Sequence, residues 1–277
     1  MPLFVAPHSI VRRIWGTADT VLFIFAGAAA EFALNKAVDW LYFTGRLPAD
    51  PLARLFSTVE YARRIVFAEQ ADAERTIARM AAIHAAVEAR RGQTIPDWAY
   101  RDVLFLLIAY SIRAFELLER PLWVTEREEI VDVFCRVGRG MGIAGLPATY
   151  AEWELAREQH LAADLATSTY TTDLYRQYRR HLGSVRYALM RHVQGQLVPP
   201  AVRRQLTLPS GAELQPVLAL YRAGRRLPPV KLLRAALLPG AYRARIAALD
   251  GAPGREAKAQ CPFHTLTRRV AAPAVRA

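Results

Sequence analysis

Helical periodicity is the feature that most restricts what this chain can fold into. Before about residue 198, apolar residues recur three and four positions apart, and alternating runs rich in β-branched residues are scarce. This spacing gathers apolar side chains on one face of a helix, and that face must be buried against other helices. The sequence therefore predicts an all-α fold in which several helices form a bundle around a shared core.

Capping residues, prolines and glycines indicate where the helices begin and end. Asp50 and Pro51 are typical of the N-cap and first turn of a helix. A second helix is expected over residues 72–91. A third, over residues 96–120, is nearly apolar all round and should be central. Residues 125–128 have the spacing of a capping box. Further helices are expected over residues 21–34, 125–138, 150–166, 171–182, 184–196, 214–223, 230–238 and 241–249.

The bulk composition favours a folded protein of the cytoplasm. The chain has 277 residues, of which 53% are apolar, which is enough for a sizeable core. Cys135 and Cys261 provide no disulfide framework, as expected for a reducing compartment. Residues 1–15 lack the pattern of a signal peptide, and Glu31 interrupts the apolar run 21–34 before it could cross a bilayer.

Positive charge is concentrated in the last part of the chain. Residues 199–277 hold 14 Lys and Arg against three acidic residues, and ten of the 17 prolines. The rest of the chain is therefore almost neutral, although the formal net charge is +12. We expect a helical domain over residues 1–198 and a basic, proline-rich helical extension over residues 199–277.

This basic extension suggests an anionic membrane surface as a partner. Residues 230–249 mix Leu and Ala with basic residues such as Lys231 and Arg234, as in a helix that lies on a bilayer. Few aromatic residues are interleaved with the arginines, so binding of nucleic acid is not expected. Ordinary solvated charge is the alternative. If the membrane interpretation holds, the protein would be peripheral at the inner membrane surface.

His84 is the candidate for chemistry that the sequence offers most clearly. It lies in the middle of the expected helix 72–91, on the face that should point to the core. Arg54 and Thr58 are four positions apart and share one face of the preceding helix. A neutral imidazole can ligate haem iron, and an arginine can hold a haem propionate. Taken alone, His84 is better explained as a core histidine, and Arg54 as a surface ion-pair residue.

The other histidines and the second cysteine are weaker candidates. His160, His181 and His192 lie in polar, arginine-rich stretches, and we expect them on solvated helix faces. Cys261 and His264 form a Cys-x-x-His motif, which alone has too few ligands for a closed zinc site.

Four separated motifs occur in an order that resembles the MpaB-type oxygenase family, whose domain is shared with the latex-clearing rubber oxygenases. The motifs are Arg54-x-x-x-Thr58, His84 with a valine three positions later, residues 113–116 (Arg-Ala-Phe-Glu) and residues 146–150 (Leu-Pro-Ala-Thr-Tyr). The resemblance implies a globin-like helical bundle around haem b. It also implies that His84 is the axial iron ligand and that Arg54 and Thr58 belong to the haem pocket.

The resemblance covers roughly residues 21–208 and implies oxidation by O2 of a small or polymeric apolar substrate, with chemistry supplied by the haem. Glu31, Asp39 and Tyr110 are candidates for the distal side, unless they are ordinary core or helix-surface residues. Two alternatives remain open. One is a non-catalytic haem-binding or oxygen-sensing protein, and the other is a cofactor-free helical protein that docks on membranes through its basic tail.

The chain departs from the commoner family pattern at several positions. Asn35-Lys36 stands in place of a His-Pro pair, and Asp102-Val103-Leu104 in place of Trp-Val-His. Ser57 replaces the lysine of the rubber oxygenases, so the resemblance does not imply rubber cleavage. Glu88 lies where many members have a simpler end to the histidine helix, which indicates a separate subfamily.

Overall fold

The protein is an all-α fold, as the sequence predicts. The computed structural model describes residues 2–44, 50–225, 227 and 243–250. Within those ranges there is no β-strand, only two isolated backbone bridges between otherwise helical parts of the chain. The finer expectation, a globin-like arrangement around haem, stays a prediction.

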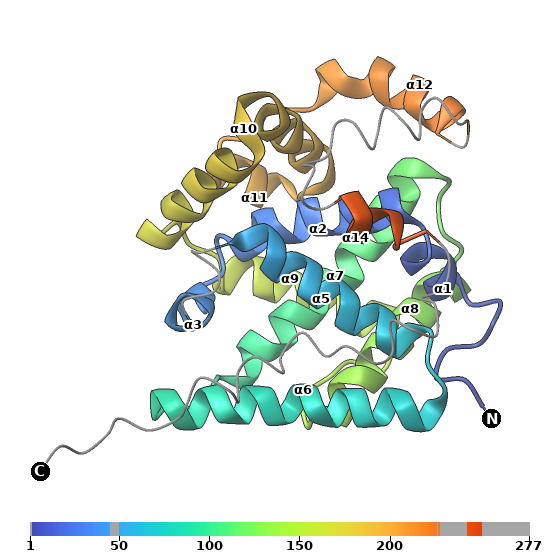
Figure 1. Cartoon of the computed structure of the whole chain (residues 1–277), viewed down its shortest axis with the longest axis vertical. Coiled ribbons are helices and arrows are strands. Elements are labelled where there is room, and N and C mark those ends of the chain that lie inside the picture. The colour runs from blue at the N-terminus through green and yellow to red at the C-terminus, as the bar shows by residue number, and fades with distance from the viewer. Residues whose placement is uncertain (1, 45–49, 226, 228–242, 251–277) are drawn as a thin grey trace, which may run out of the picture.

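The helices follow one another with short connections, and Figure 1 shows them from one side. They are α1 (Ile10–Trp15), α2 (Ala18–Phe32), α3 (Val38–Phe43), α5 (Pro51–Val66), α6 (Gln70–Arg91), α7 (Asp97–Leu118), α8 (Val124–Gly140), α9 (Tyr150–Ala163), α10 (Thr169–Leu197), α11 (Pro200–Gln205), the 3-10 helix η1 (Ala212–Leu214), α12 (Gln215–Gly224) and α14 (Arg243–Ala247). In this view α6 runs along the lower edge, and α10 and α12 lie at the top.

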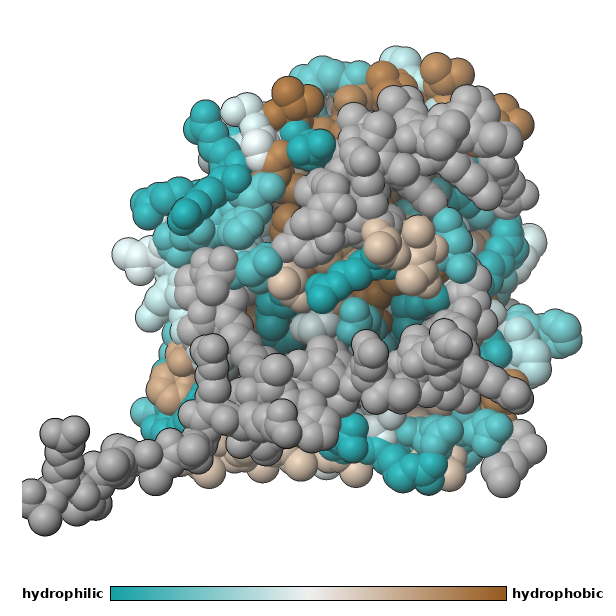
Figure 2. Space-filling view, viewed as in Figure 1, coloured by the Kyte–Doolittle hydropathy of each residue, from teal (hydrophilic) through white to brown (hydrophobic). Residues whose placement is uncertain are grey.

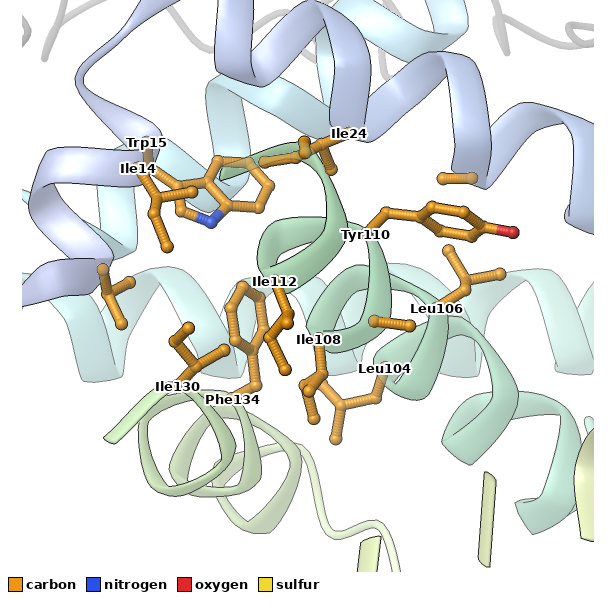
Figure 3. Packing of buried hydrophobic residues seen from close by; sticks show 14 of the residues in the cluster. Ile14, Trp15, Ile24, Leu104, Leu106, Ile108, Tyr110, Ile112, Ile130 and Phe134 are labelled. Atoms are coloured by element: carbon orange, nitrogen blue, oxygen red, sulfur yellow. The ribbon is translucent and has the colours of Figure 1, made fainter. Parts of the chain in front are cut away.

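Helix α7 is the centre of the core, which confirms the prediction made from its apolar sequence. Thirteen of its residues are buried, and it packs against α2, α8 and α9. Figure 3 shows Leu104, Ile108 and Ile112 of α7 among side chains of neighbouring helices. Helix α2 approaches α7 closely at Gly27, where a Cβ atom would collide with the Tyr110 ring. Glycine is therefore the residue that this crossing tolerates.

Local chemistry fixes several helix ends where the sequence predicts them. The Asp50 carboxylate accepts a hydrogen bond from the Ala53 N–H at 2.9 Å and caps α5. Gly92 ends α6 with a left-handed φ of 68°. Gly183 has a φ of 73° inside α10, so this element consists of two helical halves, as expected from the sequence.

The predicted capping box at Thr125 is wrong by two residues. Helix α8 begins at Val124, and the Glu126 carboxylate accepts a hydrogen bond from the N–H of Trp123 at 2.9 Å. The same carboxylate pairs with Arg120, at 2.7 and 2.8 Å. Glu126 therefore caps the backbone at Trp123, and the N-cap lies two residues earlier in the chain than predicted.

Part of the basic extension packs on the bundle. Val202, Leu208 and Leu249 are buried in the main hydrophobic cluster, and Arg225 pairs with Asp19 at 2.7 Å. Among the residues that the structure describes, none of the helices is both long and apolar enough to cross a membrane. The domain boundary at residue 199 stays a prediction.

Some expectations fall on residues outside the described ranges. These are the helix over residues 230–238, the start of the one over 241–249, most of the basic stretch 230–249, and the Cys261-x-x-His264 motif. Helix α12 is described, and its apolar residues Val217 and Leu220 are 60% and 76% exposed. Figure 2 shows brown, apolar residues gathered at the top of this face, where α12 lies.

Candidate functional sites

The structure brings Arg54, Thr58 and His84 to one region. Helices α5 and α6 are joined by a short turn and pack against each other, so the start of α5 lies near the end of α6. Arg54 Nη1 donates hydrogen bonds to Ser57 Oγ and Thr58 Oγ1, each at 3.1 Å, and its positive charge acts on His84. Ser57, in place of a lysine, therefore helps to hold the guanidinium.

His84 is a half-buried histidine in its neutral form. Its ring packs edge-on against Tyr100, with centroids 5.3 Å apart. Its Nδ1 atom is buried and has no hydrogen-bond partner among the described residues. Burial lowers the pKa of His84, and the Arg54 charge lowers it further, although Glu88 acts in the opposite direction. A neutral imidazole with an unpaired nitrogen is suited to binding a metal or a polar ligand.

An open cavity of about 430 Å³ lies beside His84. Its walls include Ala81, Ala85 and Tyr100, and its volume falls in the range of small-molecule and cofactor sites. Glu88 is also part of the wall, and its Oε1 accepts hydrogen bonds from Ile95 N–H at 2.8 Å and from the Tyr100 hydroxyl at 3.2 Å. The departure at Glu88 thus braces the loop after α6.

A second constellation is buried between α2, α7 and α9, and we name it the Glu31 cluster. Its members are Glu31, Asp102, Tyr110, Arg157 and His160, each at most 5% exposed. Arg157 holds Glu31 through two hydrogen bonds, one of 2.5 Å. The Tyr110 hydroxyl donates to Glu31 at 2.9 Å, and His160 Nε2 lies 3.2 Å from Glu31 Oε1. Both carboxylate oxygens of Glu31 therefore have hydrogen-bond or charge partners.

Opposite charges, and not burial, decide the protonation of this cluster. Burial alone would raise the pKa of Glu31, but Arg157 and His160 lower it to about 2. Burial would also lower the pKa of His160, yet the nearby Asp102 and Glu31 carboxylates raise it to about 9. Glu31 is therefore ionised and His160 carries a proton at neutral pH.

Two of the departures from the family pattern meet in this cluster. Asn35 Nδ2 donates a hydrogen bond to Asp102 Oδ2 at 3.0 Å. His160 Nδ1 lies 2.7 Å from Asp102 Oδ1 and 3.5 Å from Asp164 Oδ2. Despite these distances, no well-directed hydrogen bond satisfies Nδ1 within the part of the chain that is described. Asn35 and Asp102, two of the positions that distinguish this chain, are thus in contact in space.

The expectation that His160 lies on a solvated face is wrong, because it is 3% exposed. Trp153, Arg157 and His160 lie at helical spacing on one buried face of α9, and that spacing is the signal that could have revealed the site. A second signal is Glu31 itself, because a carboxylate inside an apolar, buried helix needs a cation as its partner.

The three distal candidates do not line the cavity beside His84. Glu31 and Tyr110 belong to the Glu31 cluster, and Asp39 pairs with Arg91 at 2.6 Å.

Residues 12–268 match the family model described as "ER-bound oxygenase mpaB/B'/Rubber oxygenase, catalytic domain". The chain belongs to this family. It is accordingly an oxygenase-type enzyme, and O2 and a substrate are the partners that the MpaB/rubber oxygenase family implies. No curated protein and no solved structure matches the chain.

Proposed function

We propose that the chain is a haem b-dependent oxygenase of the MpaB/rubber oxygenase family, with His84 as the axial iron ligand. The observation that carries this proposal is the neutral imidazole of His84, whose buried Nδ1 has no partner among the described residues. A buried nitrogen without a partner is costly, and it is retained most readily where a ligand uses the ring.

The surrounding residues fit a haem group. Arg54 supplies a positive charge that would pair with a propionate, and Ser57 and Thr58 hold its guanidinium. Ala81 and Ala85 leave space at the cavity wall, while the Tyr100 ring covers the imidazole. When bound, haem would supply the activation of O2, and the protein would supply orientation and access.

We propose that the substrate is a small or polymeric apolar molecule other than rubber. We also propose that the protein is located in the cytoplasm. The family supports the general reaction, and Ser57 in place of the rubber oxygenases' lysine argues against rubber cleavage. A haem-binding or oxygen-sensing protein without catalysis would bind haem in the same way. Consumption of O2 with added apolar compounds distinguishes it from an oxygenase.

The decisive test is the ultraviolet-visible spectrum of the full chain expressed with haem supplementation. We expect a Soret band in the wild type that is lost or shifted in His84→Ala. His8→Ala is the matched control, because His8 is an exposed histidine, and it should retain the wild-type band. A wild-type protein without a Soret band after haem reconstitution, or an unchanged band in His84→Ala, would overturn the proposal.

Arg54→Ala tests the predicted propionate partner. A charge-assisted pair contributes about 1.5–3 kcal/mol, so haem affinity should fall at least about tenfold in a Soret titration. Arg79→Ala, on an exposed face of α6, is the control and should bind as the wild type does. Equal affinities in the two variants would remove Arg54 from the site.

A further inference from the structure

Asp102, His160 and Asp164 offer one nitrogen and two carboxylate oxygens that all lie within 4.8 Å of one another. We propose that these three residues bind a divalent first-row transition-metal ion, such as Zn²⁺ or Mn²⁺. The site shares no residue with the cavity beside His84 and does not depend on the haem proposal.

The position of His160 Nδ1 is the first argument. The His160 side chain is 2% exposed, and Nδ1 faces the Asp102 and Asp164 carboxylates without a well-directed hydrogen bond. A proton on Nδ1 can point at only one carboxylate oxygen, whereas a metal ion can bind Nδ1 and an oxygen of each carboxylate at the same time. A cation between them would therefore satisfy a nitrogen that the described residues leave unsatisfied.

The outer contacts of these ligands match those of metal sites. A metal-bound histidine usually donates its second ring N–H to a carboxylate, which fixes its tautomer. Here the second nitrogen, Nε2, lies 3.2 Å from Glu31 Oε1, and Glu31 is itself held by Arg157 and Tyr110. Asn35 orients Asp102 in the same manner, with a hydrogen bond of 3.0 Å.

Charge balance favours a divalent ion. Glu31, Asp102 and Asp164 bring three negative charges, and Arg157 contributes one positive charge. His160 is also protonated at neutral pH, and a divalent cation that displaces this proton would bring the sum for these groups to zero, which reduces the cost of burying them. The Asp164 side chain is 23% exposed, so an ion has a route from solvent.

The backbone around Asp164 is also fixed. Lys36 N–H donates to the Asp164 carbonyl at 3.0 Å, and Ala166 N–H donates to the Leu34 carbonyl at 2.7 Å. The ligands are therefore placed on anchored segments, as a preorganised site requires. One imidazole and two carboxylates suit Zn²⁺, Mn²⁺ or Fe²⁺ and leave coordination positions for water or another ligand.

The test uses the tag-free full chain, treated with a chelator and then supplied with Zn²⁺, Mn²⁺ or Co²⁺ alone. After desalting, elemental analysis should find about one equivalent of metal, and Co²⁺ should give visible absorption bands. At a metal concentration 100-fold above Kd, the melting temperature should rise by about 5–10 °C. Iron is left out of the count, so that haem iron cannot contribute.

Asp164→Asn should weaken metal binding at least about tenfold, because it replaces a charged carboxylate ligand with a neutral amide. It should fold, since Asp164 is partly exposed, and far-ultraviolet circular dichroism verifies this. Asp132→Asn, at an exposed carboxylate of α8, is the matched control and should bind metal as the wild type does.

Two results would overturn the site: a folded wild type that binds none of the three ions, or equal binding by Asp164→Asn and the wild type. His84→Ala should keep its metal while losing its Soret band, so the two proposals fail separately.

Discussion

His84, on helix α6, and His160, on helix α9, lie in opposite electrostatic environments. His160 is buried among carboxylates and has a pKa raised to about 9. His84 is half-buried beside Arg54, and its pKa is lowered by burial and by that charge. Burial alone therefore does not decide the charge of a histidine. Around His160, the Asp102 and Glu31 carboxylates outweigh burial and raise its pKa, whereas around His84 burial is the main cause of the lowered pKa and the Arg54 charge adds to it.

The two regions should also contribute differently to stability. The Glu31 cluster has nearly all of its polar atoms paired inside the core, so removal of one partner leaves another charge uncompensated. The cavity beside His84 is open, and its polar groups can be solvated when a contact is lost. Two pairs of substitutions test this difference, and a third tests the helix that carries Arg54.

The largest effect is expected for Glu31→Gln. It leaves the Arg157 guanidinium buried without its counter-charge, which should cost about 3–5 kcal/mol of the free energy of unfolding. The same change at Glu88, at the open cavity, should cost less than about 1 kcal/mol. Urea denaturation followed by circular dichroism measures both. Equal losses would show that the two regions do not differ as proposed.

Removing the hydroxyl groups of Tyr110 and Tyr100 should give a smaller difference in the free energy of unfolding. Tyr110→Phe removes a buried hydrogen bond to an ionised carboxylate and should cost about 1.5–3 kcal/mol. Tyr100→Phe removes the hydrogen bond to Glu88 at the cavity wall and should cost about 0.5–1 kcal/mol. Thermal and urea denaturation provide the two free energies. The comparison fails if Tyr100→Phe is the more damaging change.

The smallest effect concerns the cap of the helix that carries Arg54. Asp50→Ala removes the acceptor for the Ala53 N–H, and loss of such a cap typically costs about 1 kcal/mol. Asp50→Asn keeps an acceptor oxygen and should be close to the wild type. If fraying of α5 also displaces Arg54, haem affinity in the Soret titration should fall for Asp50→Ala alone.

Several helix ends could be predicted from sequence because local chemistry sets them. Asp50, Gly92 and Gly183 act on backbone atoms within a few residues, so their effect is visible in the sequence itself. Helices α1, α3 and α11 were not predicted, because six residues are too few to show a period.

The two sites also differ in how far they could be predicted from the sequence. Arg54, Thr58 and His84 lie on consecutive helices, so a short connection is enough to bring them together. The partners of Glu31 on α9, in contrast, are 126 and 129 positions away along the chain. Periodicity indicates which face of α9 is buried, but it does not specify which distant carboxylate meets that face.

Arg63 has a consequence for any shortened version of this protein. It is buried, and its guanidinium donates to the carbonyl oxygens of Trp15 and Leu249, the latter at 2.7 Å. A chain cut at residue 198 would leave this cation with fewer acceptors and would strip Val202 from the core. Truncation would therefore report on folding and not on the role of the basic segment. Charge-reversing substitutions in the full-length chain are the sound way to study that segment.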